Sequence, residues 1–126
     1  MTWTKHPDCP PAGTYLCNVD DIPDTGGFEV IFGEGKEKFR ILLLRRGDEF
    51  WCYVNNCPHF SLPLNYQPQT FVTFDGMLVC AHHTAFFKFE DGSCVDGPCT
   101  GQALTVLPAH RVGMQIFFGP EVPNRS

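Results

Sequence analysis

Two short stretches of the chain each place a cysteine close to a histidine. The first reads C-P-H from Cys57 to His59, and the second reads C-A-H-H from Cys80 to His83. Thiolate sulfur and imidazole nitrogen are side-chain ligands for zinc and iron. Each stretch interrupts an apolar, strand-like run, so each would present one cysteine and one histidine from a loop. Together the two pairs indicate one four-ligand metal site.

Zinc and a two-iron cluster are the two candidates for this site. Two thiolates and two imidazoles satisfy tetrahedral zinc well. Zinc fingers, however, usually pair cysteine with cysteine on one element and histidine with histidine on another. Here each loop carries one of each kind, which suits a binuclear centre in which one iron takes both cysteines and the other both histidines. The alternative without a metal is a set of buried thiols and ordinary loop histidines.

The pattern C-x-H…C-x-x-H resembles the signature of Rieske proteins over roughly residues 55–104. Pro63-Leu64 after the first pair is a further match. The stretch D-G-S-C-V-D-G-P-C, residues 91–99, is similar to the third, proline-containing loop of Rieske ferredoxins. The resemblance implies one [2Fe-2S] cluster per chain.

The same resemblance assigns the ligands residue by residue. It makes Cys57 and Cys80 ligands of the inner iron, and His59 and His83 ligands of the outer iron. His82 does not fit C-x-x-H, so it is expected to be a loop residue near the cluster.

Rieske proteins of high potential carry a disulfide beside the ligand loops and a Ser and a Tyr that donate hydrogen bonds to the cluster. The corresponding residues here are Leu62, His82, Ala85 and Phe87, which supply neither. Fewer donors stabilise the reduced form less. We therefore expect a potential toward the lower end of the Rieske range of about -150 to +300 mV.

The elements that must position these loops are predicted to be strands. With 126 residues and 43% hydrophobic composition, the chain can build one core, so we expect a single domain over 1–126 with a cluster-binding lobe at about 55–104. The 12 glycines and 11 prolines leave no room for a long helix. We predict an all-β, antiparallel Rieske fold in which a strand-rich base carries the smaller lobe.

Apolar runs and turn residues mark the expected strands. A hairpin with a turn at Gly47-Asp48 should place Cys52 and Tyr53 on opposite faces, and Ile41 to Leu44 should be covered on both faces. Residues 65–74 are expected on a partner surface. The expected strands are 13–19, 28–32, 39–44, 50–55, 77–80, 86–89, 94–95, 104–107 and 114–118.

Charge and cysteine usage limit the partners and the compartment. The net charge of -5, with no basic cluster larger than Arg45-Arg46, predicts no nucleic-acid partner. No apolar run approaches the roughly 18 residues of a membrane span, and the first residues do not resemble an export signal, so we expect a cytoplasmic protein without membrane contact. In that compartment thiols stay reduced. The five further cysteines, Cys9, Cys17, Cys52, Cys94 and Cys99, are expected to be structural, with a Cys94–Cys99 disulfide as the disfavoured alternative.

The resemblance implies a one-electron carrier, not itself an enzyme, that serves as the ferredoxin of a multicomponent oxygenase or a similar system. Its partners would be a reductase as donor and an oxygenase or reductase as acceptor. Two alternatives stay open. One is the small Rieske subunit of a nitrite-reductase-like enzyme, and the other is a zinc-stabilised binding module with no redox role.

Overall fold

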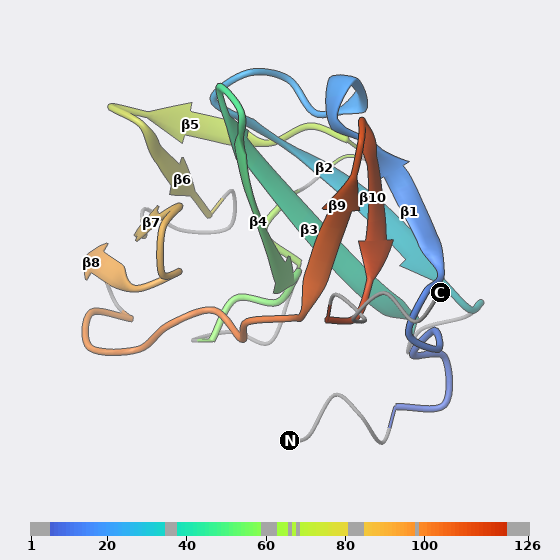
Figure 1. Ribbon diagram of the computed structural model, residues 1–126. Helices are drawn as coiled ribbons and strands as arrows, with labels where there is room; N and C mark the ends of the chain where they lie inside the picture. The colour runs from blue at the N-terminus through green and yellow to red at the C-terminus, as the bar shows by residue number, and fades with distance from the viewer. Residues whose placement is uncertain are drawn as a thin grey trace.

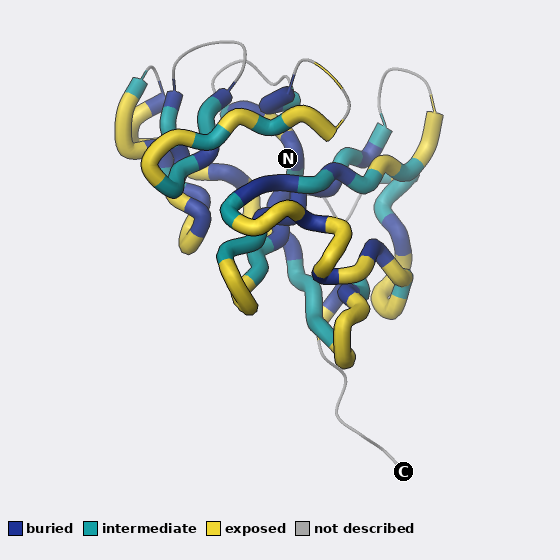
Figure 2. The backbone as a smooth tube through the Cα atoms, turned by 90° about the horizontal axis from the view of Figure 1, so that it is seen from above, coloured by how far each residue is buried: buried dark blue, intermediate teal, exposed yellow. Residues whose placement is uncertain are grey.

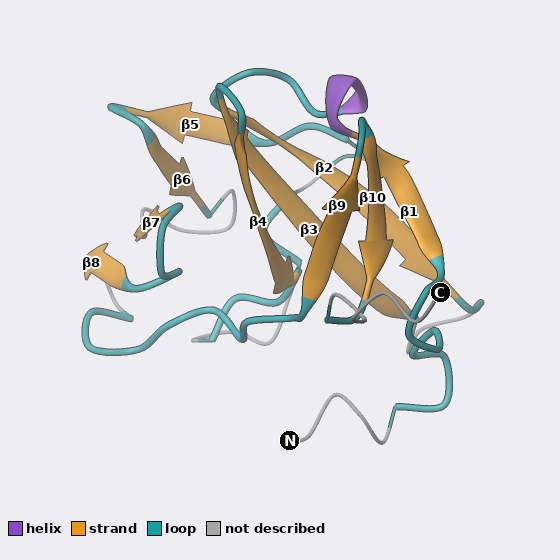
Figure 3. Cartoon of the chain, in the orientation of Figure 1, coloured by secondary structure: helices purple, strands orange, loops and turns teal. Residues whose placement is uncertain are grey.

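A computed structural model describes residues 6–34, 38–58, 63–65, 67, 69–80, 85–97 and 99–120, and its regular structure is antiparallel β-sheet (Figures 1 and 3). Within these ranges the one helical segment is a single 3-10 turn, Val19–Asp21. The strands are β1 Tyr15–Asn18, β2 Gly26–Phe32, β3 Phe39–Arg46, β4 Glu49–Val54, β5 Val72–Phe74, β6 Met77–Val79, β7 Phe86–Lys88, β8 Cys94–Asp96, β9 Ala109–Val112 and β10 Gln115–Phe118. The predicted all-β fold is confirmed.

The strands form three sheets, in the orders β1-β10-β9, β2-β3-β4 and β5-β6-β7-β8. In Figure 1 the β2-β3-β4 sheet stands between the other two. The predicted hairpin is present, since β3 pairs with β4 from Ile41↔Val54 to Arg46↔Glu49. Gly47 takes φ +61° in its turn, a left-handed conformation that glycine adopts without strain.

The side chains of β3 and β4 point alternately to the two faces of the sheet, so the sheet separates two hydrophobic cores. Residues 41–44 are all 0% exposed, which confirms the prediction of a strand covered on both faces. Leu42 and Tyr53 point into one core, whereas Leu43 and Cys52 point into the other, because successive side chains of a strand alternate between faces. In Figure 2 the buried residues gather toward the middle of the molecule, and several turns at its edge are exposed.

The core shared with β5–β8 is called here the lobe core, and the core shared with β1, β9 and β10 is called the base core. The lobe core comprises Leu42, Leu44, Tyr53, Cys57, Leu64, Leu78, Cys80, Ala85, Phe87, Phe89, Cys94, Cys99 and Leu104. The base core comprises Leu16, Cys17, Val19, Ile22, Phe39, Ile41, Leu43, Cys52, Leu107, Ile116 and Phe118. These two cores divide the fold into a base and a lobe, and the lobe core also includes Leu42, Leu44 and Tyr53 of β3 and β4.

The segment 104–107 was expected to be a strand and is not one. Its neighbourhood pairs only through the isolated bridges Ser93↔Ala103 and Tyr53↔Val106. Leu104 N donates to Gly92 O and Leu107 N donates to Cys52 O, both at 2.9 Å, so the segment passes from the β7–β8 turn to β4 without following either partner. A segment that changes its hydrogen-bonding partner within four residues cannot form the continuous backbone hydrogen-bond ladder of a strand.

Two short strands were not predicted. β5 is only three residues long, and its end residues Val72 and Phe74 are 48% and 64% exposed, so hydrophobic periodicity gives little signal. β9 reads Ala-His-Arg-Val and has no fully buried residue. It is held by pairing with β10, from Gln115↔Val112 to Phe118↔Ala109.

Candidate metal centre

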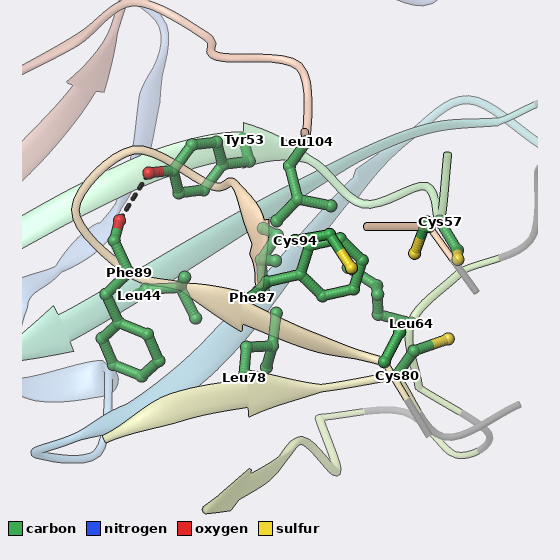
Figure 4. Close-up of a cluster of buried hydrophobic side chains, with 13 residues drawn as sticks. Leu44, Tyr53, Cys57, Leu64, Leu78, Cys80, Phe87, Phe89, Cys94 and Leu104 are labelled. Atoms are coloured by element: carbon green, nitrogen blue, oxygen red, sulfur yellow. Dashed lines mark hydrogen bonds between the residues drawn. The ribbon is translucent and has the colours of Figure 1, made fainter. Parts of the chain in front are cut away.

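Two of the four expected ligands, Cys57 and Cys80, lie within the described residues, and both are buried. Cys57 is 0% exposed and Cys80 is 2% exposed. They follow β4 and β6, respectively, and both belong to the lobe core. Figure 4 shows them at the same end of this core, away from Tyr53. The other expected ligands, His59 and His83, lie outside the described residues.

The backbone around Cys57 is fixed on both sides by Asn55. Asn55 N donates to Arg40 O at 3.0 Å, which anchors this residue to β3. The side-chain Oδ1 of Asn55 accepts a hydrogen bond from Leu64 N at 2.8 Å. The residue two before Cys57 is therefore joined to the residue seven after it. This side-chain bridge brings the two ends of the first ligand stretch together.

A backbone bridge does the same at the second stretch. Cys80 N donates to Ala85 O at 3.0 Å, directly beyond the β6–β7 pairing of Val79 with Phe86. Ala85 is 0% exposed, so this bridge lies inside the lobe core. Residues on either side of 81–84 are thus held together at the end of a hairpin.

The third, proline-containing stretch brings Cys94 and Cys99 to the same place. Cys94 N donates to Gln102 O, and Gln102 N donates to Cys99 O, both at 2.9 Å. The pKa of Cys99 is raised to about 12, chiefly by burial and in addition by the neighbouring sulfurs of Cys94 and Cys57. The structure therefore places Cys99 beside an expected ligand, a proximity that the spacing of the sequence does not reveal.

Cys94 and Cys99 are not joined by a disulfide in the structure. Cys17 and Cys52 lie in the base core, and burial raises the pKa of Cys17 to about 12 and that of Cys52 higher still. Thiols with raised pKa values stay protonated and behave as small apolar side chains. The structural role expected for these two residues is confirmed. Cys9 is only partly buried.

A buried polar group that the sequence does not predict lies beside the first ligand stretch. Glu29 on β2 is 3% exposed and forms an ion pair with Arg40 at 2.9 Å. Asn65 is 7% exposed and donates to the same carboxylate. The expectation that Asn65 lies on a partner surface is therefore wrong. Nothing in the pattern of β2 marks Glu29 as buried, because its partners come from residues far away in the sequence.

Of the expected ligands, Cys57 and Cys80 are suited to supply the two thiolates of a Rieske-type iron-sulfur centre. Across the described ranges, no group of three or more His, Cys, Asp or Glu side chains gathers as a metal site. Two buried thiols from separate stretches, in an apolar surrounding, are the donors that one iron of a binuclear cluster requires. The same part of the chain contains no helix long and apolar enough to cross a membrane.

Comparisons with solved structures agree with this arrangement. The ferredoxin of carbazole 1,9a-dioxygenase from Nocardioides aromaticivorans IC177 has a TM-score of 0.69 and 16% identity, over 88% of this chain and 100% of that chain. The ferredoxin of Sphingomonas yanoikuyae B1 has a TM-score of 0.61 and 20% identity, over 86% and 99%. A chain of the complex of reduced oxygenase and oxidized ferredoxin in carbazole 1,9a-dioxygenase has a TM-score of 0.68 and 20% identity, over 92% and 100%. At these identities the likeness shows the fold.

The family itself is shown by the sequence. No curated protein sequence matches the chain. The family model described as Rieske [2Fe-2S] domain matches residues 13–112, which include all four expected ligand positions. A Rieske domain holds one [2Fe-2S] cluster, so the predicted cofactor is confirmed at the level of the family. The chain belongs to the Rieske [2Fe-2S] domain family.

Proposed function

We propose that the protein is a one-electron carrier of the ferredoxin type, whose cluster is held by Cys57, His59, Cys80 and His83. The observation that carries this proposal is the burial of Cys57 and Cys80 in one core, each on a stretch that also carries an expected histidine ligand. When bound, the cluster takes up and releases a single electron. The chain surrounds the two thiols with apolar side chains and fixes the backbone at both stretches. Both features keep a metal centre rigid and dry.

The partners we propose are a reductase as electron donor and an oxygenase as acceptor. The fold is that of ferredoxins whose names place them in carbazole 1,9a-dioxygenase. Because these relatives are ferredoxins of an oxygenase system, the role we propose is delivery of electrons and not catalysis. A net charge of -5 suits steering toward a basic partner surface. The thiols of Cys9, Cys17, Cys52, Cys94 and Cys99 form no disulfide, which supports a reducing compartment such as the cytoplasm.

Iron and acid-labile sulfide should be measured first, on protein purified without oxygen from iron-supplemented cells. We expect equal amounts of iron and sulfide and a visible chromophore that dithionite bleaches. Zinc without sulfide in such a preparation would contradict the electron-transfer proposal and favour the zinc-stabilised binding module.

The ligand set is tested by single alanine variants at the four positions. Cys57→Ala, Cys80→Ala, His59→Ala and His83→Ala should each lose the chromophore. Matched controls are Cys17→Ala, a buried thiol of the base core, and His82→Ala, the neighbour of the second histidine. The controls should keep the chromophore. Loss of the cluster in His82→Ala but not in His83→Ala would reassign the second imidazole.

Purification under native conditions separates a free carrier from an enzyme subunit. A free ferredoxin should elute alone and be reduced by a reductase added in catalytic amount. A large partner that stays bound at stoichiometric amount through purification would favour the nitrite-reductase-like subunit.

A further inference from the structure

We propose that Glu29 is a positioning residue that holds the first ligand stretch against β2 and thereby sets the geometry around Cys57. The part of this inference that concerns the cluster rests on the proposed function. The stretch concerned comprises residues 55–58 and 63–65 and is called here the Cys57 segment. Glu29 lies outside it, on β2, where it pairs with Leu42 of β3.

The Glu29 carboxylate is buried and receives three donors. Its Oε2 accepts from Arg40 Nη1 at 2.9 Å and from Asn55 Nδ2 at 2.6 Å. Its Oε1 accepts from Asn65 Nδ2 at 3.3 Å. The Glu29 side chain is 1% exposed, whereas that of Arg40 is 29% exposed. Hydrogen bonds to a buried charged group are stronger than those between neutral groups, because little water competes for them.

Two of the three donors belong to the Cys57 segment, and they stand at its two ends. Asn55 lies two residues before Cys57, and Asn65 lies beyond the far end of the ligand stretch. The two side chains also join each other, since Asn55 Nδ2 donates to Asn65 Oδ1 at 2.9 Å. Asn55 Oδ1 in turn accepts from Leu64 N at 2.8 Å. One carboxylate therefore fixes both ends of the segment at once.

A second contact joins Gln69, beyond the end of the Cys57 segment, to the backbone of Glu29 on β2. Gln69 Oε1 accepts from Glu29 N at 2.8 Å, and Gln69 Nε2 donates to Glu29 O at 2.7 Å. β2 is an edge strand of its sheet, so its outward N–H and C=O groups need partners. The side-chain amide of Gln69 supplies them in the manner of an added strand.

An ion pair at this place is not needed for the sheet alone. Burying a carboxylate costs stability unless its partners compensate, and an apolar residue would satisfy a strand at lower cost. The geometry of the donors instead favours a role in placing Asn55, and through it Cys57. Residues that orient a metal ligand without touching the metal commonly change its affinity and its spectrum when they are replaced.

The direct test is Glu29→Gln in the cluster-loaded protein. The amide of glutamine places an N–H₂ group where the carboxylate met only donors, and it removes the charge opposite Arg40. We expect iron release to a chelator to become about tenfold faster. We also expect the EPR signal of the dithionite-reduced protein to shift and broaden, and the midpoint potential to move.

Glu90→Gln is the matched control. It makes the same chemical change in the ion pair with Arg46, and the Glu90 side chain is 57% exposed. Its iron release, EPR signal and potential should equal those of the unaltered protein. If Glu29→Gln lowers stability to urea but leaves all three cluster properties unchanged, Glu29 is structural only and the inference is overturned.

A readout without a cluster separates this inference from the proposed function. In protein prepared without iron, amide hydrogen exchange at Leu64 should be about tenfold or more faster in Glu29→Gln, because Asn55 loses the group that orients it. Exchange in β10 should not change. Faster exchange at Leu64 in a protein that never takes up a cluster would support the role of Glu29 and reject the electron-transfer proposal.

Asn65→Ala covers the case in which Glu29→Gln does not fold. It removes the contacts of the Asn65 side chain to Asn55 and Glu29 while leaving the Glu29–Arg40 pair in place. Because Asn65 belongs to neither hydrophobic core, truncation should leave the fold intact. Faster iron release in this variant supports the inference. Unchanged release, EPR signal and Leu64 exchange contradict it.

Discussion

Tyr53 shows how a single side chain joins the base of this molecule to its cluster-binding lobe. It lies on β4 and is 1% exposed, and its hydroxyl donates a hydrogen bond to the Phe89 carbonyl oxygen (Figure 4). The Tyr53 ring also packs closely against Gly92 in the β7–β8 turn. A Cβ on Gly92, which has φ +73°, would stand 2.8 Å from the Tyr53 ring. The hydroxyl and the ring of one residue therefore fix where the turn can lie.

Tyr53→Phe should lower the free energy of unfolding by about 1–3 kcal/mol. The change keeps the ring but takes a donor from a buried carbonyl group, which then loses its hydrogen bond without gaining water. Urea denaturation followed by tryptophan fluorescence measures the difference. Tyr15→Phe is the matched control, since Tyr15 is 46% exposed and its hydroxyl bonds to Asn18 at the surface. Equal effects of the two variants would contradict this account of Tyr53.

At the residue scale, the sequence indicates the expected metal ligands more clearly than the residues that hold those ligands in place. Cys57 and Cys80 stand out because their spacing to histidine is unusual, and the structure buries both. Glu29 and Asn65 carry no such mark, because burial depends on contacts between residues 36 positions apart. The same is true of Cys99, whose closeness to Cys57 depends on how the third stretch turns back.

Carboxylates at turns connect strand elements and make them sensitive to acid. Asp24 Oδ1 accepts from Gly47 N at 2.8 Å, which joins the segment before β2 to the β3–β4 turn. Asp91 Oδ1 accepts from Ser93 N at 2.9 Å within the β7–β8 turn. These backbone hydrogen bonds are the main reason that the pKa values of Asp24 and Asp91 lie below their ordinary range.

We expect stability to fall as the pH drops below the ordinary aspartate pKa of about 3.9. A carboxyl group with a lowered pKa in the folded state stabilises that state above the unfolded pKa and loses the contribution as pH falls through the folded pKa. Urea midpoints across this acid range give the slope. Asp91→Asn should flatten it, because the amide oxygen can still accept from Ser93 but does not titrate in this range.

Predictability also differs between elements. β3 and β4 were predicted because their alternation is long and each face meets a core. The sequence does not predict β5, because three residues carry no period. It predicts a strand at 104–107 because the segment is rich in apolar residues, but the structure pairs this neighbourhood only through isolated bridges. The conformation of a short segment depends on contacts with residues that are close in space but far away in the sequence.

On the scale of the whole molecule, Arg46 ties the central sheet to the lobe at the β5–β6 and β7–β8 turns. Its Nη1 forms an ion pair with Glu90 at 2.8 Å, and its Nη2 donates to Gly76 O at 2.7 Å. The guanidinium also lies over the Phe89 and Trp51 rings, 4.9 and 5.6 Å from their centroids. A planar group with several donors can make all of these contacts at once.

Arg46→Lys should lower stability by about 1 kcal/mol, because an ammonium group cannot form the fork and the stacking together. Amide exchange should quicken at the β5–β6 turn and not in β9 or β10. The control is Arg111→Lys, because the Arg111 guanidinium donates to Gly113 O in the β9–β10 turn and to Asp48 O in the β3–β4 turn, away from the lobe. Uniform quickening in all sheets would show that Arg46 acts on global stability and does not bind the lobe specifically.

The reduction potential is also a property of the whole site. The described positions Ala85 and Phe87, both 0% exposed, carry no hydroxyl group that could donate to a cluster. We expect a midpoint potential below zero, within the Rieske range of about -150 to +300 mV. A redox titration followed by EPR measures it, and a value well above zero would contradict the expectation.

The central sheet has a consequence for the order of assembly during synthesis. Strands β2, β3 and β4 pair through two consecutive hairpins within residues 26–54, and the first expected iron ligand follows only at Cys57. Contacts between near neighbours form fast, so the hairpins can close while the rest of the chain is still being made. Iron and sulfide would then bind to a chain in which the β2-β3-β4 sheet has already folded. Slow delivery of iron should therefore lengthen maturation of the lobe without exposing the three-stranded sheet to misfolding.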